Sequence, residues 1–347
     1  MQYFPYSCET GTIRLAGNET VICQFLRQVN PKRKAGRQLG KYPSQSKTHF
    51  PHCWTIENFP FFQGQSSNMQ KLPFGFTSKE IIDQGRTSRE NIDAVKQWLS
   101  SVDSAIIPRV QDELVVIFLL SCDNDLPLTK HTITMYYKCK RNSPDIFDNR
   151  EMDRADLKKA MNSIHMCSLP VRTDENYAIH HFKLNDTNYL NFDLVPVMKL
   201  SYMLLDITQE KDLPRGLVVI IDCKGVGLMH LTRMKIGPMR RYFQFLQEGF
   251  PIQMKVIHII NAVYFFDKFL NVVKLCTKSE LMEMIKVHPP SADPEKLFAL
   301  VPKKCWPEDY GGDLPSTETL HEKAIEQFEE KQEFWRLEQE IRCKNSD

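Results

Sequence analysis

The sequence predicts an α/β fold, in which a small N-terminal helical domain precedes a mixed or parallel sheet covered by helices. Two compact runs rich in Val and Ile, GLVVIID (216–222) and KVIHIIN (255–261), are typical of strands buried on both faces. About thirty residues separate them and include the helix-like segment 238–250, a length that suits a right-handed β-α-β crossover. A further strand is expected at YAIHHFKL (177–184).

Helical signals gather in residues 76–150. Two capping-box patterns, TSKE (77–80) and TSRE (87–90), each place Thr three residues before Glu. Apolar residues then recur at helical spacing, and two more helices are expected near 114–120 and 128–141. This part of the chain is therefore predicted to be a small helical domain.

Length and patterning divide the 347 residues into four parts. Residues 1–75 form a basic extension, with nine Lys and Arg against three Glu, a surplus of 9 − 3 = +6, and are expected to be disordered. The helical domain, 76–150, and the α/β domain, 151–315, follow. A charged helix is expected in 316–347, capped by Thr319 and Glu322.

A cluster of metal-ligating residue types lies in the extension, at His49, His52 and Cys53, with Cys8 and Cys23 further away. Zinc sites need paired ligand spacings that this segment lacks, so solvated side chains are the favoured interpretation. No metal and no cofactor are expected.

Charge and cysteine usage narrow the class of protein. A net charge of +2 and the lack of a recognisable nucleic-acid motif argue against nucleic-acid binding. The ten cysteines form no CxxC pair, which favours free thiols in a reducing compartment. The sequence shows no signal peptide and no apolar run of about 18 residues, so a cytoplasmic protein is expected.

The segment 222–230 is the most enzyme-like feature, because Asp222 is followed by Gly225 and Gly227. A dinucleotide fingerprint needs a third glycine, and His230 stands in its place. A tight loop that needs positive φ at glycine explains the pair better. Asp222 could serve as a base, but no nucleophile is paired with it.

The histidines of the predicted strands are weak catalytic candidates. His258 lies within an apolar strand and is interpreted as a core histidine. His180 and His181 are neighbours in a strand, so at least one of them is expected to point outward. No hydrolase elbow, phosphate loop or zinc-helix motif is present, and the protein is predicted not to be an enzyme.

Apolar side chains are abundant in the helix-like segments 198–205, 242–250 and 264–273. The last of these has an aromatic face opposite a polar one. Periodicity alone slightly favours a filled core, because counting residues does not show a cavity.

Four stretches carry a resemblance to a known family: 216–231, 249–261, 274–288 and 301–312. Their order and spacing resemble the CRAL-TRIO (Sec14-like) lipid-binding family, closest to insect α-tocopherol transfer protein-like and retinaldehyde-binding-like proteins. The likeness covers roughly residues 77–315. It implies an α/β sandwich around an apolar pocket, closed by a mobile helix at 264–275.

The resemblance implies an intracellular carrier that binds a tocopherol-, retinoid- or phospholipid-like molecule and transfers it at membranes. The pocket lining that it implies is Leu200, Met203, Phe245, Leu246, Phe250, Ile252, Ile257, Ile259, Phe265, Phe266, Phe269 and Val273.

Membrane or phosphoinositide contact is expected at Lys255, Lys274, Lys278 and Lys286, although a merely solvated face explains these lysines about equally well. Other basic positions of the tocopherol carrier align here with Gln253, Glu280 or Met282, and Met284. Lys199 and Met203 align with its small hydroxyl residues. Cargo and release signal are therefore expected to differ, in a monomer that is peripheral at membranes.

Two rival functions remain. A non-transferring interaction module would have its pocket packed shut and would bind a protein partner through the C-terminal helix. An oxidoreductase would bind a nucleotide at 222–230.

Overall fold

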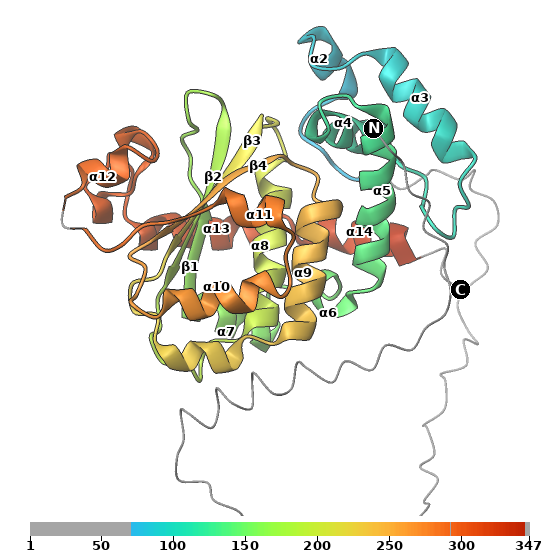
Figure 1. Ribbon diagram of the computed structural model, residues 1–347. Helices are drawn as coiled ribbons and strands as arrows, with labels where there is room; N and C mark the ends of the chain where they lie inside the picture. Colours follow the sequence, from blue (N-terminus) through green and yellow to red (C-terminus); the bar gives the residue numbers. More distant parts are fainter. Residues whose placement is uncertain (1–70, 292, 344–347) are drawn as a thin grey trace, which may run out of the picture. The chain divides into compact units, whose positions relative to one another are not determined.

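A five-stranded sheet with helices on both faces forms the centre of the computed structural model, which describes residues 71–291 and 293–343 (Figure 1). The strands are β1 (Ile164–Ser168), β2 (Tyr177–Leu184), β3 (Gly216–Asp222), β4 (Met254–Ile260) and β5 (Ile285–Val287), in that spatial order. β1 pairs antiparallel with β2, and the other neighbours are parallel. The predicted mixed sheet is confirmed.

Within the described residues, five helices make up the helical domain that the sequence predicts. They are α2 (Ser78–Asp83), α3 (Arg89–Ser100), α4 (Asp112–Ser121), α5 (Leu126–Arg141) and α6 (Pro144–Phe147). Thr77 caps α2 in the expected box with Glu80. The second expected box is wrong in its capping residue: Ser88, not Thr87, accepts the amide of Asn91, because the Thr87 hydroxyl instead donates to Asn124.

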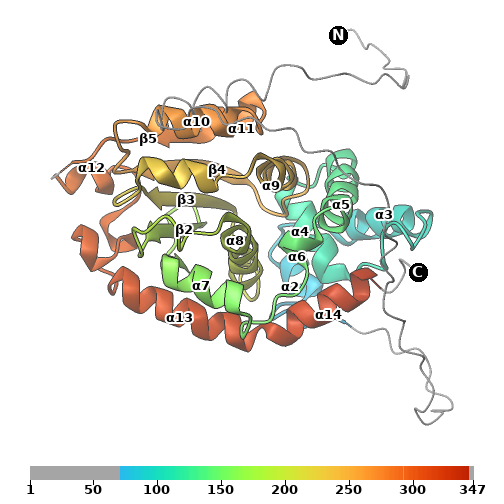
Figure 2. The same cartoon turned by 90° about the horizontal axis from the view of Figure 1, so that it is seen from below.

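Helices cover the two faces of the sheet differently. α7 (Ala155–Ser163) and α13 (Thr317–Glu330) lie on one side, and α10 (Phe266–Lys274) and α11 (Ser279–Met284) lie on the other (Figure 2). Alternate residues of β3 show the division, because Val218 and Ile220 pack on the α7 side while Leu217 and Val219 pack on the α10 side.

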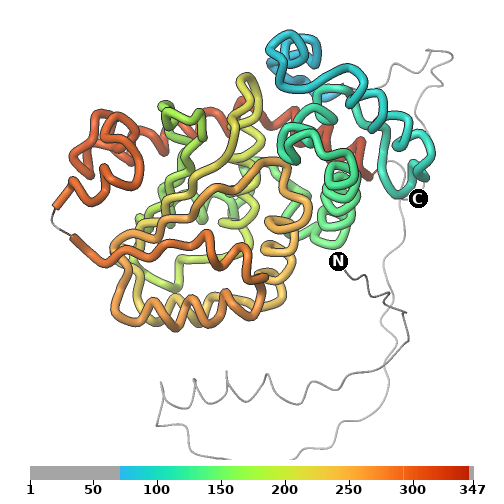
Figure 3. The backbone as a smooth tube through the Cα atoms, turned by 45° about the horizontal axis from the view of Figure 1, so that its top comes forward, coloured from blue at the N-terminus to red at the C-terminus, as the bar shows by residue number. Residues whose placement is uncertain are grey.

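The remaining helices complete these layers: α8 (Leu194–Thr208), α9 (Ile236–Glu248), α12 (Glu295–Phe298) and the 3-10 turns η1 (Leu228–Arg233), η2 (Lys303–Cys305) and η3 (Glu308–Tyr310). α9 is the predicted crossover between the parallel strands β3 and β4. Figure 3 follows the backbone from α9 through β4 into α10. In the described part of the chain, no helix is long and apolar enough to cross a membrane.

Because both faces of the sheet are covered, the expectation that His180 or His181 points outward is wrong. Both side chains are buried. The His180 ring bonds to the Thr208 hydroxyl at 2.8 Å. Neither ring nitrogen of His181 has a partner among the described residues.

A C-terminal arm, residues 317–343, follows the α/β domain. It consists of two helices, α13 and α14 (Gln332–Cys343), rather than one continuous helix. The arm begins at Ser316, whose hydroxyl accepts the amide of Thr319, so the cap predicted at Thr319 and Glu322 is displaced. α13 lies along α7, and α14 continues past α6 (Figure 2).

The end of α9, at Gly249, packs directly against the backbone of α5. A Cβ atom on Gly249 would lie 2.8 Å from the backbone nitrogen of Tyr136. Real Cβ atoms do not approach so closely, so this contact requires glycine. The helical domain and the α/β domain therefore meet here without intervening side chains.

Candidate ligand site

The α10 face of the sheet carries an apolar layer, here called the α10-side cluster. Its buried members are Ala178, Leu205, Leu217, Val219, Cys223, Ile252, Ile257, Ile259 and Leu281. Strand β4 contributes Ile257 and Ile259 to this face because side chains alternate along a strand. α10 and α11, together called the cover, lie over it (Figures 1 and 2).

The aromatic face of α10 is directed inward, as its periodicity predicts. Phe265 and Phe269 are buried, and Phe266 packs against the α10-side cluster. The rings of Phe266 and Phe269 stack at 5.8 Å. Asp267 and Asn271 occupy the exposed side of the helix. Tyr264, just before α10, is 96% exposed.

The structure brings half of the predicted pocket residues into or against one cluster. Those in or against the α10-side cluster are Leu246, Phe250, Ile252, Ile257, Ile259 and Phe266. Phe265 and Phe269 belong to the same aromatic face of the cover.

The other four predicted residues lie elsewhere. Phe245 and Val273 pack into the core of the helical domain. Leu200 and Met203 are fully buried in the cluster on the opposite, α7 side of the sheet. α8 presents different faces to different clusters, and sequence spacing alone did not indicate which face meets the α10 side.

Two small cavities border this region, each of about 10 Å³. That volume is about the room that one water molecule needs, whereas a drug-sized ligand occupies a pocket of roughly 300–1,000 Å³. Both cavities lie beside α8 and the segment 251–253, and no residue of α10 lines either of them.

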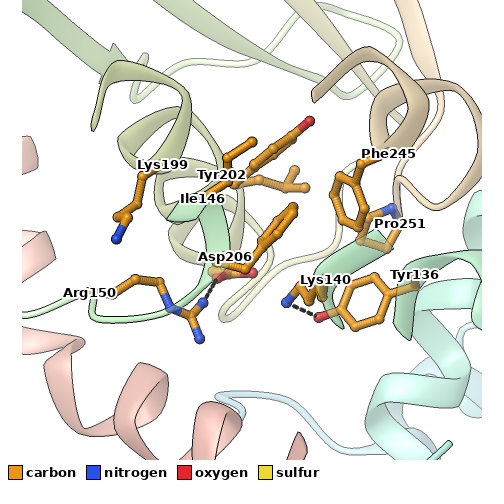
Figure 4. A pocket seen from close by; sticks show the side chains of 11 residues that line it. Tyr136, Lys140, Ile146, Arg150, Lys199, Tyr202, Asp206, Phe245 and Pro251 are labelled. Atoms are coloured by element: carbon orange, nitrogen blue, oxygen red, sulfur yellow. Dashed lines mark hydrogen bonds and ion pairs between the residues drawn. The ribbon is translucent and has the colours of Figure 1, made fainter. Parts of the chain in front are cut away.

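The first cavity is lined by charged groups as well as aromatic ones (Figure 4). Lys140, Arg150 and Lys199 project toward it, together with Asp206. Lys199 donates to the backbone carbonyl of Asn149 at 3.0 Å and to that of Asp148. Lys199 is thus buried, with backbone carbonyls as acceptors for its ammonium.

The four lysines predicted to contact membranes do not form one cluster. Lys255 lies at a register shift between β3 and β4, and its ammonium donates to Gln253 at 2.5 Å. Lys278 pairs with Glu248 at 2.8 Å. Lys274 is exposed at the end of α10, and Lys286 is exposed on the edge strand β5.

The 222–230 segment has the geometry of a tight loop. Gly225 has φ of +85°, and the backbone then enters a 3-10 turn in which His230 accepts the amide of Gly227. Asp222 is buried and accepts bonds from Tyr310 and Asn261. The α-helix that would hold a pyrophosphate does not follow the loop, and Asp222 is occupied by structural bonds.

His258 is a core histidine, as its apolar context predicts. It is buried, and its Nδ1 lies 3.1 Å from Nε2 of His288. Burial, together with smaller contributions from His288 and Lys286, lowers the pKa of His258 to about 4. The two imidazoles are therefore neutral and share one hydrogen bond at neutral pH.

Among residues 71–291 and 293–343, no group of three or more His, Cys, Asp or Glu side chains could hold a metal. The cluster at His49, His52 and Cys53 lies outside the described residues. The seven cysteines of the described part are free. Burial raises the pKa of Cys167 and Cys223 to about 12, so these thiols are unreactive.

Sequence reasoning missed one group of residues altogether. Lys140, Arg150, Glu338 and Arg342 are buried together, although sequence reasoning assigned none of them to the core or to a site. Glu338 and Arg342 share a helical face with Trp335, a spacing that could have indicated burial.

Comparison with known proteins identifies the class of protein that this fold and site define. Residues 162–312 match the CRAL/TRIO domain, and residues 85–157 match the Pinta-like UBA domain. The chain thus carries a CRAL/TRIO domain over the whole sheet and its α10 cover, preceded by a UBA-like helical domain. The family resemblance and the fold predicted from it are confirmed.

Individual relatives are distant. The mouse alpha-tocopherol transfer protein-like protein is 22% identical over 251 residues, which cover 71% of each chain. Clavesin-1 of Xenopus laevis is also 22% identical, over 68% of this chain and 74% of its own. A solved chain described as the crystal structure of Sfh5 has a TM-score of 0.42 and 15% identity, over 70% of this chain and 90% of that one.

Proposed function

We propose that this protein is a carrier that binds a hydrophobic small molecule between the sheet and α10 and transfers it at membranes. CRAL/TRIO proteins bind and transfer lipophilic ligands, and the domain match spans the α10-side cluster. The observation that carries the proposal is the aromatic face of α10 lying on that cluster. Tocopherol-, retinoid- and phospholipid-like molecules share the apolar surface that this face would cover.

Ligand entry in this proposal needs the cover to open. Apolar contacts carry no directional requirement, so the aromatic face of α10 can leave the α10-side cluster and return to it without a fixed bonding geometry. A ligand that buries about 400 Å² of apolar surface would gain roughly 10 kcal/mol, at about 25 cal/mol per Å². Part of that gain would offset the contacts that α10 gives up.

Membrane contact would involve the ends of the cover. Leu275 is 51% exposed beside Lys274, and Tyr264 is almost fully exposed at the other end of α10. An apolar residue beside a basic one suits the boundary of an anionic bilayer. Within this proposal the protein is a cytoplasmic monomer that visits membranes peripherally, with Lys274 and Lys286 meeting a phosphoinositide or another anionic lipid.

The most direct test is to extract the purified full chain and identify bound apolar molecules by mass spectrometry. Transfer of a fluorescent lipid between vesicles would then be measured with and without phosphoinositide. The proposal expects a stoichiometric ligand and protein-dependent transfer. An empty protein that moves none of the tocopherol, retinoid and phospholipid probes would contradict it.

A second function is favoured by the tight packing. Because the adjoining cavities are only large enough for water, the α10-side cluster could be a filled core in a non-transferring interaction module. That function predicts no ligand and unchanged thermal stability when lipid probes are added, whereas a carrier is stabilised by its ligand.

A further inference from the structure

The last helix, α14, meets the rest of the molecule through a buried ionic cluster, here called the Glu338 cluster: Lys140, Arg150, Arg342 and Glu338. Their side chains are only 4%, 4%, 5% and 7% exposed. Glu338 accepts from Lys140 at 3.1 Å and from Arg342 at 3.2 Å, and it pairs with Arg150 as well. One carboxylate therefore neutralises cations from α5, from the segment after α6 and from its own helix.

Further bonds attach α14 to the end of the helical domain. Arg342 pairs with Asp148 at 2.6 Å, and the amide of Asn149 donates to the Gln339 side chain at 2.9 Å. The ring of Phe334 meets that of Phe74 edge to face at 5.6 Å. Ionic, polar and aromatic contacts thus reach the helical side from three successive turns of α14.

The same helix also holds the α/β domain. The indole of Trp335 donates to Asp206 of α8 at 2.9 Å, and Lys331 lies 3.6 Å from Glu210. Arg150 is 3.6 Å from Asp206, so the Glu338 cluster extends across the boundary (Figure 4). α14 contacts residues within both family matches, and it lies outside both matched ranges.

We propose that α14 is a built-in ligand of the UBA-like helical domain, and that Glu338 is the residue by which it clasps this domain to the CRAL/TRIO domain. The face formed by Lys140, Arg150 and Phe147 is basic at its centre and apolar around it. Such a face fits an amphipathic helix with one central carboxylate. In this protein that helix is α14, which belongs to the same chain.

The physical reason is the cost of separating the partners. If α14 left, Lys140 and Arg150 would both lose Glu338, and Arg150 would keep Asp206 at 3.6 Å. Separating these buried cations from the Glu338 carboxylate is unfavourable unless they reach water. If α14 stays, the two domains keep one relative placement. The state of α14 would therefore decide whether the helical domain is free to contact another partner.

Hydrogen exchange of the full-length Glu338→Gln protein tests this proposal without any lipid ligand. We expect amides of α5 and α14 to exchange about a hundredfold faster, with β2 to β4 unchanged, because only the clasp opens. Glu340→Gln is the matched control, since Glu340 lies on the same helix and pairs with Arg336 at the surface. An equal change throughout the sheet, or no change beyond the control, would overturn the proposal.

A milder variant covers the case in which Glu338→Gln does not fold. Gln339→Ala removes the bond to Asn149 without leaving a buried charge, and it should speed exchange in α14, and in α5 against which α14 packs, by about two- to tenfold. A synthetic peptide of residues 331–343 should then restore protection in α5, and the same peptide with Gln at 338 should not. Equal rescue by both peptides, or by neither, would contradict a ligand-like role for α14.

Discussion

The two helices α10 and α14 cover the molecule in different ways. Both are amphipathic and of similar length, with nine and 12 residues. α10 meets the sheet through aromatic rings, and polar links from the cover to α9 include the bond of the Lys278 amide to Gln247 and the exposed pair between Lys278 and Glu248. α14 is fixed by buried ions whose bonds require one geometry. In the proposed carrier, α10 is the part that moves and α14 is the part that stays in place.

The largest expected effect is on the fixed side. Glu338→Ala should lower the free energy of unfolding by about 3–5 kcal/mol, because Lys140 loses its carboxylate partner while Arg150 and Arg342 keep only the carboxylates of Asp206 and Asp148. Glu340→Ala, at an exposed position of the same helix, should change it by less than about 1 kcal/mol. Denaturant titration of the two variants checks the difference, and similar losses would remove the contrast between the two helices.

The movable side is tested by Phe266→Asp, which places a carboxylate on the inward face of α10. We expect retention of bound ligand to fall about tenfold, because an unpaired charge is unfavourable against apolar surface. Asn271→Asp adds the same charge on the exposed face and should retain ligand normally. Unchanged retention in Phe266→Asp, measured by mass spectrometry of extracts, would mean that this face does not cover the ligand.

Acid should loosen the β4–β5 edge of the sheet first. His258 in the folded state has a pKa of about 4, below its unfolded value of about 6.5. Neutral His258 therefore contributes stability that is complete above about pH 6.5 and is lost as the pH falls toward 4. We expect a loss of about 1–3 kcal/mol over this window, absent in His258→Gln. His288 and Lys286, which face His258 from β5, are unchanged in the control.

The Glu338 cluster should respond only at lower pH. Burial raises the pKa of Glu338, but Lys140, Arg150 and Arg342 outweigh that effect and hold it well below the usual range. The stability it contributes is present above the unfolded pKa of about 4.3 and is lost as the pH falls below it. Hydrogen exchange measured during acidification checks this order. If exchange in α14 rose at a higher pH than exchange in β5, the Glu338 cluster would be the first to lose stability, contrary to this prediction.

The smallest expected effect concerns the exposed link of the cover. Lys278→Ala removes the pair with Glu248, in which the lysine side chain is 61% exposed. A loss of about 0.2–1 kcal/mol is expected in thermal unfolding, since water screens such pairs. A loss comparable to that of Glu338→Ala would mean that the cover is anchored as firmly as the clasp.

Local patterns predicted the elements that organise the sheet. The apolar runs of β3 and β4 and the crossover α9 follow from period and length, and the aromatic face of α10 from its spacing. The edge strands β1 and β5 escaped prediction. β1 continues directly from α7, and β5 has only three residues. Neither strand therefore shows an alternating apolar and polar pattern of its own.

The Glu338 cluster could not be predicted from sequence because its partners are far apart in the chain. Lys140 and Glu338 are separated by 198 positions. A charged residue on a helix is usually solvated, so local spacing favours an exposed face. The division of the expected pocket residues between the two faces of the sheet has the same origin, since α8 contributes to more than one cluster.

Gly249 adds a mechanical consequence to the contrast between cover and clasp. Since the end of α9 lies against the backbone of Tyr136, α9 is held at one end by the helical domain. We therefore do not expect α9 to move together with α10. In the proposed carrier, the hinge of the cover would then lie after β4, where Asn261 adopts φ of +50° before the turn into α10.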